Sequence, residues 1–132
     1  MADGNGIKFY RCNTCGNLMF AIVDSGVNPD CCGVGMELLE SKKGGEFMEK
    51  HLPVVQRSGD KVLVRVGSEL HPMEVEHRIE WIALIDGKRI DFQRMTLKGE
   101  PVADFTIREG KEMLRVYAYC SSHGLWESEA WI

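Results

Sequence analysis

The chain has 132 residues, of which 44% are hydrophobic and 27% are charged, values that exclude an intrinsically disordered chain and a membrane-embedded one. Its formal net charge of −4 argues against a general nucleic-acid binder, because neutralising phosphates requires clustered Lys and Arg. Since no stretch is apolar for long enough to span a bilayer and the first residues lack the pattern of a secretory signal, we expect a cytoplasmic protein with neither a membrane nor a nucleic-acid partner.

The first part of the chain, up to about residue 40, combines short strand-like runs with turns that contain Gly and Cys. The runs cover residues 7–11, 18–23 and 36–39. A segment of this size cannot bury a core of its own, and domains this small are usually held together by a metal, by disulfides or by a partner subunit. We therefore expect residues 1–40 to form a separate small metal-binding domain.

Four of the five cysteines lie in this segment, at Cys12, Cys15, Cys31 and Cys32. Cys12 and Cys15 are spaced so that both thiolates can turn onto one ion, and an adjacent pair follows after fifteen intervening residues. Four thiolates complete a tetrahedral site for iron or zinc, which the adjacent pair should distort. The alternatives are a purely structural zinc site and a redox disulfide, which is disfavoured because no thioredoxin-like βαβ pattern is present.

Residues 41–50, SKKGGEFMEK, have the composition of a linker, and we place the domain boundary near Ser41. Beyond them apolar and polar residues alternate, and turn sequences separate the runs. The expected strands are residues 61–66, 76–85, 89–95, 103–109 and 112–120. The pattern predicts a mainly β chain in which residues 41–132 form an immunoglobulin-like antiparallel β-sandwich.

All four histidines of the chain stand in turn-like or strand-end settings, and the fifth cysteine, Cys120, lies far from the others. A single histidine of this kind is usually a surface residue. Four of them together with an isolated cysteine indicate convergence on one metal: His51, His71, His77 and His123. An offset of six would place two of them, His71 and His77, on one face of an extended segment. Imidazole nitrogens with one thiolate suit iron, copper or zinc, so spacing alone does not identify the metal.

The segments CNTCG, CCG, EKHLP, HPMEVEHRIEWI and CSSHGLW resemble, in order and spacing, the signatures of desulfoferrodoxin, the two-iron form of superoxide reductase. This resemblance covers nearly the whole chain and implies two iron ions. A desulforedoxin-like iron would be bound by Cys12, Cys15, Cys31 and Cys32. A catalytic iron would be bound equatorially by His51, His71, His77 and His123 and axially by Cys120. The chain departs from the family at Ser121, where Asn is common, beside the thiolate whose donor strength neighbouring hydrogen bonds tune.

The resemblance also implies an activity, the one-electron reduction of superoxide to hydrogen peroxide with uptake of two protons. Lys50 would attract superoxide and hydrogen-bond to the reaction intermediate, and Glu49 would occupy the sixth coordination position of the oxidised iron. The family further implies a rubredoxin-like electron donor and a homodimer. Lys42 and Lys43, in the expected linker, are expected to be ordinary solvated lysines.

Two other functions are compatible with these residues. The first is a non-catalytic metalloprotein, a zinc ribbon joined to a β-sandwich interaction module, which would be colourless whereas ferric thiolate sites are coloured. The second is a hydrolase with a Cys120–His123 nucleophile. It is disfavoured because no Asn or Asp that could orient the histidine, and no oxyanion motif, accompanies the pair.

Overall fold

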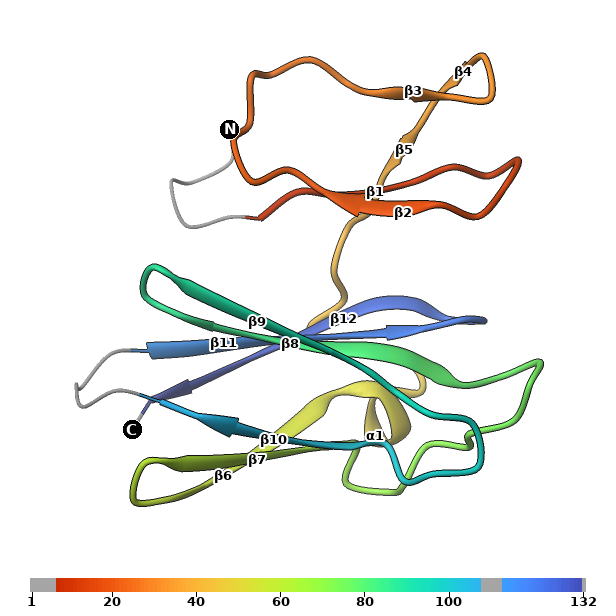
Figure 1. Ribbon diagram of the computed structural model, residues 1–132. Helices are drawn as coiled ribbons and strands as arrows, with labels where there is room; N and C mark the ends of the chain where they lie inside the picture. Colours follow the sequence, from red (N-terminus) through yellow and green to blue (C-terminus); the bar gives the residue numbers. More distant parts are fainter. Residues whose placement is uncertain (1–6, 108–112, 132) are drawn as a thin grey trace. The chain divides into compact units, whose positions relative to one another are not determined.

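The computed structural model describes residues 7–107 and 113–131, and the chain divides into two compact units, Met1–Glu40 and Ser41–Ile132. Each unit is built almost entirely from antiparallel strands, as Figure 1 shows, which confirms the prediction of a mainly β chain. Within the described ranges no helix is long and apolar enough to cross a membrane. The elements in chain order are β1 (Phe9–Arg11), β2 (Leu18–Phe20), β3 (Asp30–Cys31), β4 (Val34–Gly35), β5 (Glu37–Leu38), α1 (Met48–His51), β6 (Pro53–Ser58), β7 (Lys61–Val66), β8 (Ile79–Asp86), β9 (Arg89–Arg94), β10 (Val102–Thr106), β11 (Met113–Cys120) and β12 (Gly124–Trp131).

The amino-terminal unit contains a three-stranded sheet and a two-stranded hairpin. Strand β1 lies between β2 and β5, and β3 pairs with β4 around the adjacent cysteines. Its buried cluster consists of Tyr10, Cys12 and Met36. Because one of these three residues is a cysteine of the expected metal site, the core of this unit and its metal site are the same small region.

The second unit is a sandwich of two antiparallel sheets, which Figure 1 shows as two layers. One sheet has the order β10-β7-β6 and the other the order β12-β11-β8-β9. Alternate side chains of β7, Val62, Val64 and Val66, point into the space between the sheets. They pack in one cluster with residues such as Ile82 and Val116 of the facing sheet. The alternating pattern in the sequence therefore corresponds to one buried face on each sheet.

The expected strands in the second unit correspond to β7, β8, β9, β10 and β11, although residues 108, 109 and 112 of the expected strands lie outside the described residues. The sequence patterns missed β6 and β12. Strand β12 buries three consecutive residues, Leu125, Trp126 and Glu127, so it does not alternate. The Glu127 carboxylate can be buried because two partners offset the cost of removing it from water. It accepts a hydrogen bond from Ser41 and forms an ion pair with Arg115.

Helix α1 is a single turn that is held against the end of β7. A Cβ atom placed on Gly67, directly after β7, would lie 2.6 Å from the carbonyl oxygen of Glu49, so only glycine fits there without a shift of the backbone. The same carbonyl accepts hydrogen bonds from the Ser68 hydroxyl at 3.1 Å and the Glu69 N–H at 2.9 Å. These contacts set the position of α1 and hence of His51, its last residue.

Candidate metal centres

The structure brings together all nine Cys and His side chains, in two groups whose candidate donor atoms lie within 4.8 Å of one another. The first group, in the amino-terminal unit, is Cys12, Cys15, Cys31 and Cys32. The sulfur atoms of Cys15 and Cys31 are 3.6 Å apart, and those of Cys31 and Cys32 are 4.0 Å apart. All four cysteines are free thiols, which is the form that binds a metal.

The pKa values of two of these thiols are strongly shifted from the ordinary value of a cysteine. The Cys15 N–H donates to Cys12 Sγ at 3.4 Å, and this hydrogen bond is the main reason that the pKa of Cys12 falls to about 6. The neighbouring side chains of Cys15 and Cys12 raise the pKa of Cys32 to about 12. Four sulfurs packed this closely resist ionising together, and a bound cation relieves that conflict by compensating the thiolate charges.

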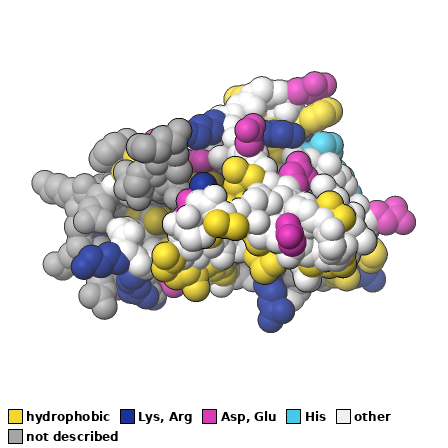
Figure 2. All heavy atoms as spheres, turned by 90° about the horizontal axis from the view of Figure 1, so that it is seen from above, with side chains coloured by type: hydrophobic (Ala, Val, Ile, Leu, Met, Phe, Trp, Pro, Cys, Tyr) yellow, Lys and Arg dark blue, Asp and Glu magenta, His cyan; other side chains and the backbone are white. Residues whose placement is uncertain are grey.

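The second group lies in the sandwich and combines residues from four segments. His51 ends α1, His71 and His77 lie between β7 and β8, Cys120 ends β11, and His123 lies in the turn before β12. His51, His71 and Cys120 are 2%, 3% and 0% exposed. Three donors are thus shielded from water, while His77 and His123 are only partly buried. Histidine atoms are visible at the surface in Figure 2.

His71 and His77 converge, but not through an extended segment. Two main-chain hydrogen bonds close a bend between Glu74 and His77, with N–H to carbonyl distances of 3.0 and 3.2 Å. The expectation that an even offset keeps both histidines on one face of a strand is therefore wrong. The bend folds the segment back, and the two ring centroids are 4.6 Å apart.

The four imidazole rings form a square. Neighbouring centroids are separated by 4.6 Å (His51 to His71), 4.6 Å (His71 to His77), 4.9 Å (His77 to His123) and 4.7 Å (His123 to His51), and each pair meets edge to face. His51 and His77 face each other across the square at 6.2 Å. Four rings in this order can direct one nitrogen each toward a common centre.

The hydrogen bonds of the buried rings leave their Nε2 atoms available to a metal. His51 Nδ1 lies 2.8 Å from the Phe47 carbonyl and His71 Nδ1 lies 2.7 Å from the Pro72 carbonyl, so both Nδ1 atoms act as donors. In neutral rings both Nε2 atoms then carry lone pairs, and these two atoms are 3.0 Å apart. Two nitrogens at about 2.1 Å from one ion and at right angles would be roughly 3.0 Å apart.

Two further donors complete this arrangement. Cys120 Sγ lies 3.2 Å from His71 Nε2 and 3.8 Å from His123 Nδ1. His77 Nε2 is buried and, among the described residues, has no hydrogen-bond partner. An unpartnered buried nitrogen is costly unless a ligand engages it. The donor set therefore fits a metal ion bound by four imidazoles and one thiolate.

The pKa values of the histidines and of Cys120 are consistent with metal binding. Burial lowers the pKa of His51 and His77 and brings that of His71 to about 4, so these imidazoles are neutral near pH 7. Burial raises the pKa of Cys120, and the main-chain N–H groups of Ser122 and His123 oppose this shift. The thiol is thus protonated until a cation displaces the proton.

The turn that carries Cys120 and His123 is attached to the loop that carries His77. Arg78 and Ser121 form a reciprocal pair, with the Ser121 N–H donating to the Arg78 carbonyl at 2.9 Å and the Arg78 N–H donating to Ser121 Oγ at 3.0 Å. Ser122 Oγ also donates to the Glu76 carbonyl at 3.3 Å. The Ser121 hydroxyl therefore connects the two loops that carry these donors.

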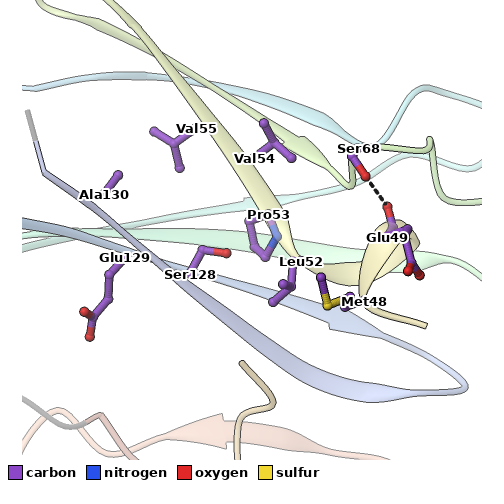
Figure 3. Close-up of a pocket in the computed structure, with 10 residues that line it drawn as sticks. All are labelled: Met48, Glu49, Leu52, Pro53, Val54, Val55, Ser68, Ser128, Glu129 and Ala130. Carbon is purple, nitrogen blue, oxygen red and sulfur yellow. Dashed lines mark hydrogen bonds between the residues drawn. The ribbon is translucent and has the colours of Figure 1, made fainter. Parts of the chain in front are cut away.

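The two charged residues before His51 lie outside the group of donors. Glu49 is exposed, and its carboxylate is not among the five grouped donor residues. It lines a shallow cavity beside α1, where Figure 3 shows the carboxylate pointing away from Ser68. Lys50 is exposed and close enough to His77 for its ammonium to help lower the pKa of that ring, after the larger effects of burial and of His123.

Comparison with known proteins identifies the family. The Desulfoferrodoxin family model matches residues 43–129. A desulfoferrodoxin homolog of Archaeoglobus fulgidus is 42% identical over 122 residues, which cover 92% of this chain and 96% of the relative. The chain belongs to the desulfoferrodoxin family. Iron is the metal of this family, and the two groups of donors described above suit it.

Solved structures extend the comparison. The superoxide reductase from Treponema pallidum superposes with a TM-score of 0.80 at 28% identity, over 96% of this chain and 99% of that one. A superoxide reductase (1Fe-SOR) from Giardia intestinalis superposes with a TM-score of 0.55 at 33% identity, over 64% of this chain and 99% of that one. The first result supports the β-sandwich of the present fold, and the second aligns nearly the whole of the other chain with about two thirds of this one.

Sequence reasoning missed two neighbours of the second group, Lys42 and Trp126. The Trp126 ring stacks on His51 with a centroid distance of 4.8 Å, and its Nε1 donates to the His123 carbonyl at 3.2 Å. The Lys42 ammonium donates to the same carbonyl at 3.0 Å, so Lys42 is exposed, as expected, but is hydrogen-bonded to the turn that carries His123. The position of Trp126, three residues after a ligand, was the only available signal for either residue.

Proposed function

We propose that this chain is a superoxide reductase, an oxidoreductase that converts superoxide, one electron and two protons into hydrogen peroxide. The observation that carries the proposal is the group of five donors in the sandwich, His51, His71, His77, His123 and Cys120. The chain's membership of the desulfoferrodoxin family and its similarity to solved superoxide reductases support the same activity.

The five residues would hold one iron, and the bound iron would supply the electron that superoxide accepts. With neutral imidazoles and one thiolate, a divalent ion keeps a net charge of about +1, which favours an anionic substrate despite the net charge of the chain. The shielded thiolate of Cys120 would strengthen electron donation to the ion, because water cannot compete for its lone pairs. His77 and His123, at the less buried side, would face the route that the substrate takes.

Lys50 and Glu49 would act at this less buried side. Lys50 would attract superoxide and donate a hydrogen bond to the oxygen species in the site, since its ammonium already acts on His77. Glu49 would occupy the sixth coordination position of oxidised iron after a rotation of its side chain. A Glu49→Ala variant whose oxidised spectrum equals that of the wild type at every pH would contradict this role.

The four cysteines would hold a second iron in the amino-terminal unit, a desulforedoxin-like domain of residues 1–40, and residues 41–132 would form the reductase domain. The superoxide reductase from Giardia intestinalis, 99% of which aligns with 64% of this chain, supports a reductase domain that is shorter than the whole chain. The free thiols of the described residues suit a reducing compartment such as the cytoplasm.

The electron donor would be a small rubredoxin-like protein, and the chain would form a homodimer. Large apolar side chains on the amino-terminal unit, including Ile22 and Val23 at 85% and 84% exposure, support self-association because isolated soluble domains seldom expose several of these together. Light scattering across protein concentration tests the dimer, and a monomer at all concentrations would exclude it.

The test of the activity is the stoichiometry of hydrogen peroxide. Iron-loaded and pre-reduced protein is mixed with superoxide, and hydrogen peroxide and oxygen are measured. Reduction yields one hydrogen peroxide for each superoxide and no oxygen, whereas dismutation yields half as much hydrogen peroxide together with oxygen. A colourless zinc protein that consumes no superoxide would instead favour the non-catalytic alternative.

A further inference from the structure

The main chain of Lys42 is hydrogen-bonded to β12, the strand that follows Cys120 and His123, although the sequence indicates that Lys42 lies in a linker. Its N–H donates to the Leu125 carbonyl at 2.9 Å, and its carbonyl accepts from the Glu127 N–H at 2.9 Å. These bonds form a parallel bridge between Lys42 and Trp126. The main chain of Lys42 therefore has a defined position on β12.

A buried carboxylate strengthens this attachment. Glu127 is 4% exposed, and its Oε1 accepts a hydrogen bond of 2.7 Å from the hydroxyl of Ser41, next to Lys42. Its Oε2 lies 3.1 Å from Arg115 Nε. A buried carboxylate needs such partners, and losing one of them leaves an uncompensated charge. The segment that carries Lys42 is thus tied to β12 by side-chain as well as main-chain bonds.

The side chain of Lys42 reaches the metal centre through the carbonyl of His123. Lys42 Nζ lies 3.0 Å and Trp126 Nε1 lies 3.2 Å from this oxygen, so two donors occupy its two lone pairs. Nζ also lies 5.2 Å from the centre of the Trp126 ring, which stacks on His51. The ammonium therefore contacts the main chain of one ligand and the aromatic ring that supports another.

The charge of Lys42 lies close to two of the donor residues. Its ammonium is 3.0 Å from the carbonyl oxygen of His123 and stands over the Trp126 ring, which stacks on His51. A cation in this position disfavours additional positive charge at the centre. It should therefore favour the reduced metal over the oxidised one.

We propose that Lys42 is a positioning residue of the five-donor centre, which holds the His123 turn in place and raises the reduction potential of the bound iron. This inference rests on the proposed iron site. It assigns to Lys42 a role different from that of Lys50, because Lys42 acts through His123 and Trp126 rather than on the incoming substrate.

The test compares three variants of the full-length iron protein. Lys42→Met removes the charge and the hydrogen bond, Lys42→Arg keeps both, and Lys88→Met removes a lysine from the exposed turn between β8 and β9, at the opposite end of β8 from His77. The midpoint potential of the centre is measured by redox titration, following the thiolate-to-iron absorption band. Circular dichroism and iron content confirm that each variant is folded and loaded.

Lys42→Met should lower the ratio of reduced to oxidised iron at the wild-type midpoint by about threefold or more, because the oxidised centre gains stability once the cation is removed. Lys42→Arg should restore the potential, and Lys88→Met should leave it unchanged. A folded Lys42→Met protein with the wild-type potential would overturn the proposal, as would an equal shift in Lys88→Met.

A second readout does not depend on iron. Each variant is prepared without iron and with Cys15→Ser and Cys32→Ser, which removes two thiolates of the first group, and is titrated with Co²⁺ while the cobalt–thiolate absorption band of Cys120 is recorded. Lys42→Met should shift this band and Lys42→Arg should not, and an unshifted band in Lys42→Met would count against the proposal. If the wild-type protein fails to reduce superoxide, the proposed function falls, whereas the role of Lys42 is still decided by the potential and the cobalt spectrum.

Discussion

Cys120 Sγ lies 3.2 Å from His71 Nε2, although 49 positions separate the two residues in the chain. The contact joins the end of β11 to the loop after β7, and both residues are almost completely buried. A thiol and an imidazole nitrogen at this distance can bind one ion together. Because the two donors come from different segments of the chain, the contribution of each can be tested by its own substitution.

Cys120→Ser should abolish the thiolate-to-iron absorption band of the second site and reduce superoxide turnover to background, because a hydroxyl is a much poorer electron donor than a thiolate. Absorption spectroscopy with iron quantitation and a superoxide assay checks this result. Cys15→Ser is the matched control at the other group and should leave this band in place. An unchanged spectrum in Cys120→Ser would remove Cys120 from the coordination sphere.

Cys15→Ser should eliminate the colour of the amino-terminal site while pre-reduced protein still reduces superoxide, because the two groups share no ligand. The measurement is the single-turnover rate with superoxide, compared with the iron content and spectrum of each site. Loss of the reaction while the five-donor site remains loaded would show that the first iron is essential for it.

Gly67→Ala should disturb the second site from a distance, because a Cβ atom at this position would lie 2.6 Å from the Glu49 carbonyl and 2.9 Å from the Lys50 carbonyl carbon. Both contacts are with main-chain atoms of α1, so relief requires a movement of the helix that carries His51. We expect a loss of about 2 kcal/mol in the free energy of unfolding, with weaker metal binding.

The control for this prediction is Gly44→Ala, where an added Cβ would meet no atom within 4 Å. Denaturant unfolding and Co²⁺ titration are measured for both variants. Equal stability and equal cobalt affinity in the two variants would show that the close approach of Gly67 to α1 contributes neither to the free energy of unfolding nor to metal binding.

Lys50→Ala should slow the reaction with superoxide by about tenfold at low salt, equivalent to about 1.4 kcal/mol, because an ammonium near the site raises the local concentration of an anion. The deficit should shrink at physiological ionic strength, where screening sets in over roughly 8 Å. Lys50→Arg should recover much of the rate, and Lys88→Ala is the control of equal charge. The rates are measured by stopped flow or pulse radiolysis. If Lys50→Ala reacts at the rates of Lys88→Ala across ionic strength, Lys50 does not attract the substrate.

Binding of Co²⁺ to the second site should release a proton, because burial raises the pKa of Cys120 and the metal binds its thiolate. The buried imidazoles should release none near neutral pH, since their pKa values are lowered. The affinity should therefore rise by about tenfold per pH unit between about pH 7 and 9, with about one proton released per ion. Titration is performed on a Cys15→Ser/Cys32→Ser variant, and adding Cys120→Ser should remove the release.

The sequence by itself identified the candidate donors and the general architecture. The spacing of Cys12 and Cys15, the adjacent pair that follows, and the grouping of histidines near turns depend on residue type and local order, which are visible in one dimension. Alternation of apolar and polar residues likewise indicates strands such as β7, because one face of a strand is buried and the other is not.

Only the tertiary structure decided how these parts meet. The bend between Glu74 and His77, the glycine contact of Gly67 with α1, and the non-alternating β12 each depend on neighbours that are distant in sequence. The hydrogen bond from Lys42 to the His123 carbonyl is the clearest example, because 81 positions separate the two residues and the local sequence of Lys42 is that of a flexible linker. Hydrogen bonds and packing act through space, so a residue whose contacts are all distant carries no local signal of its position.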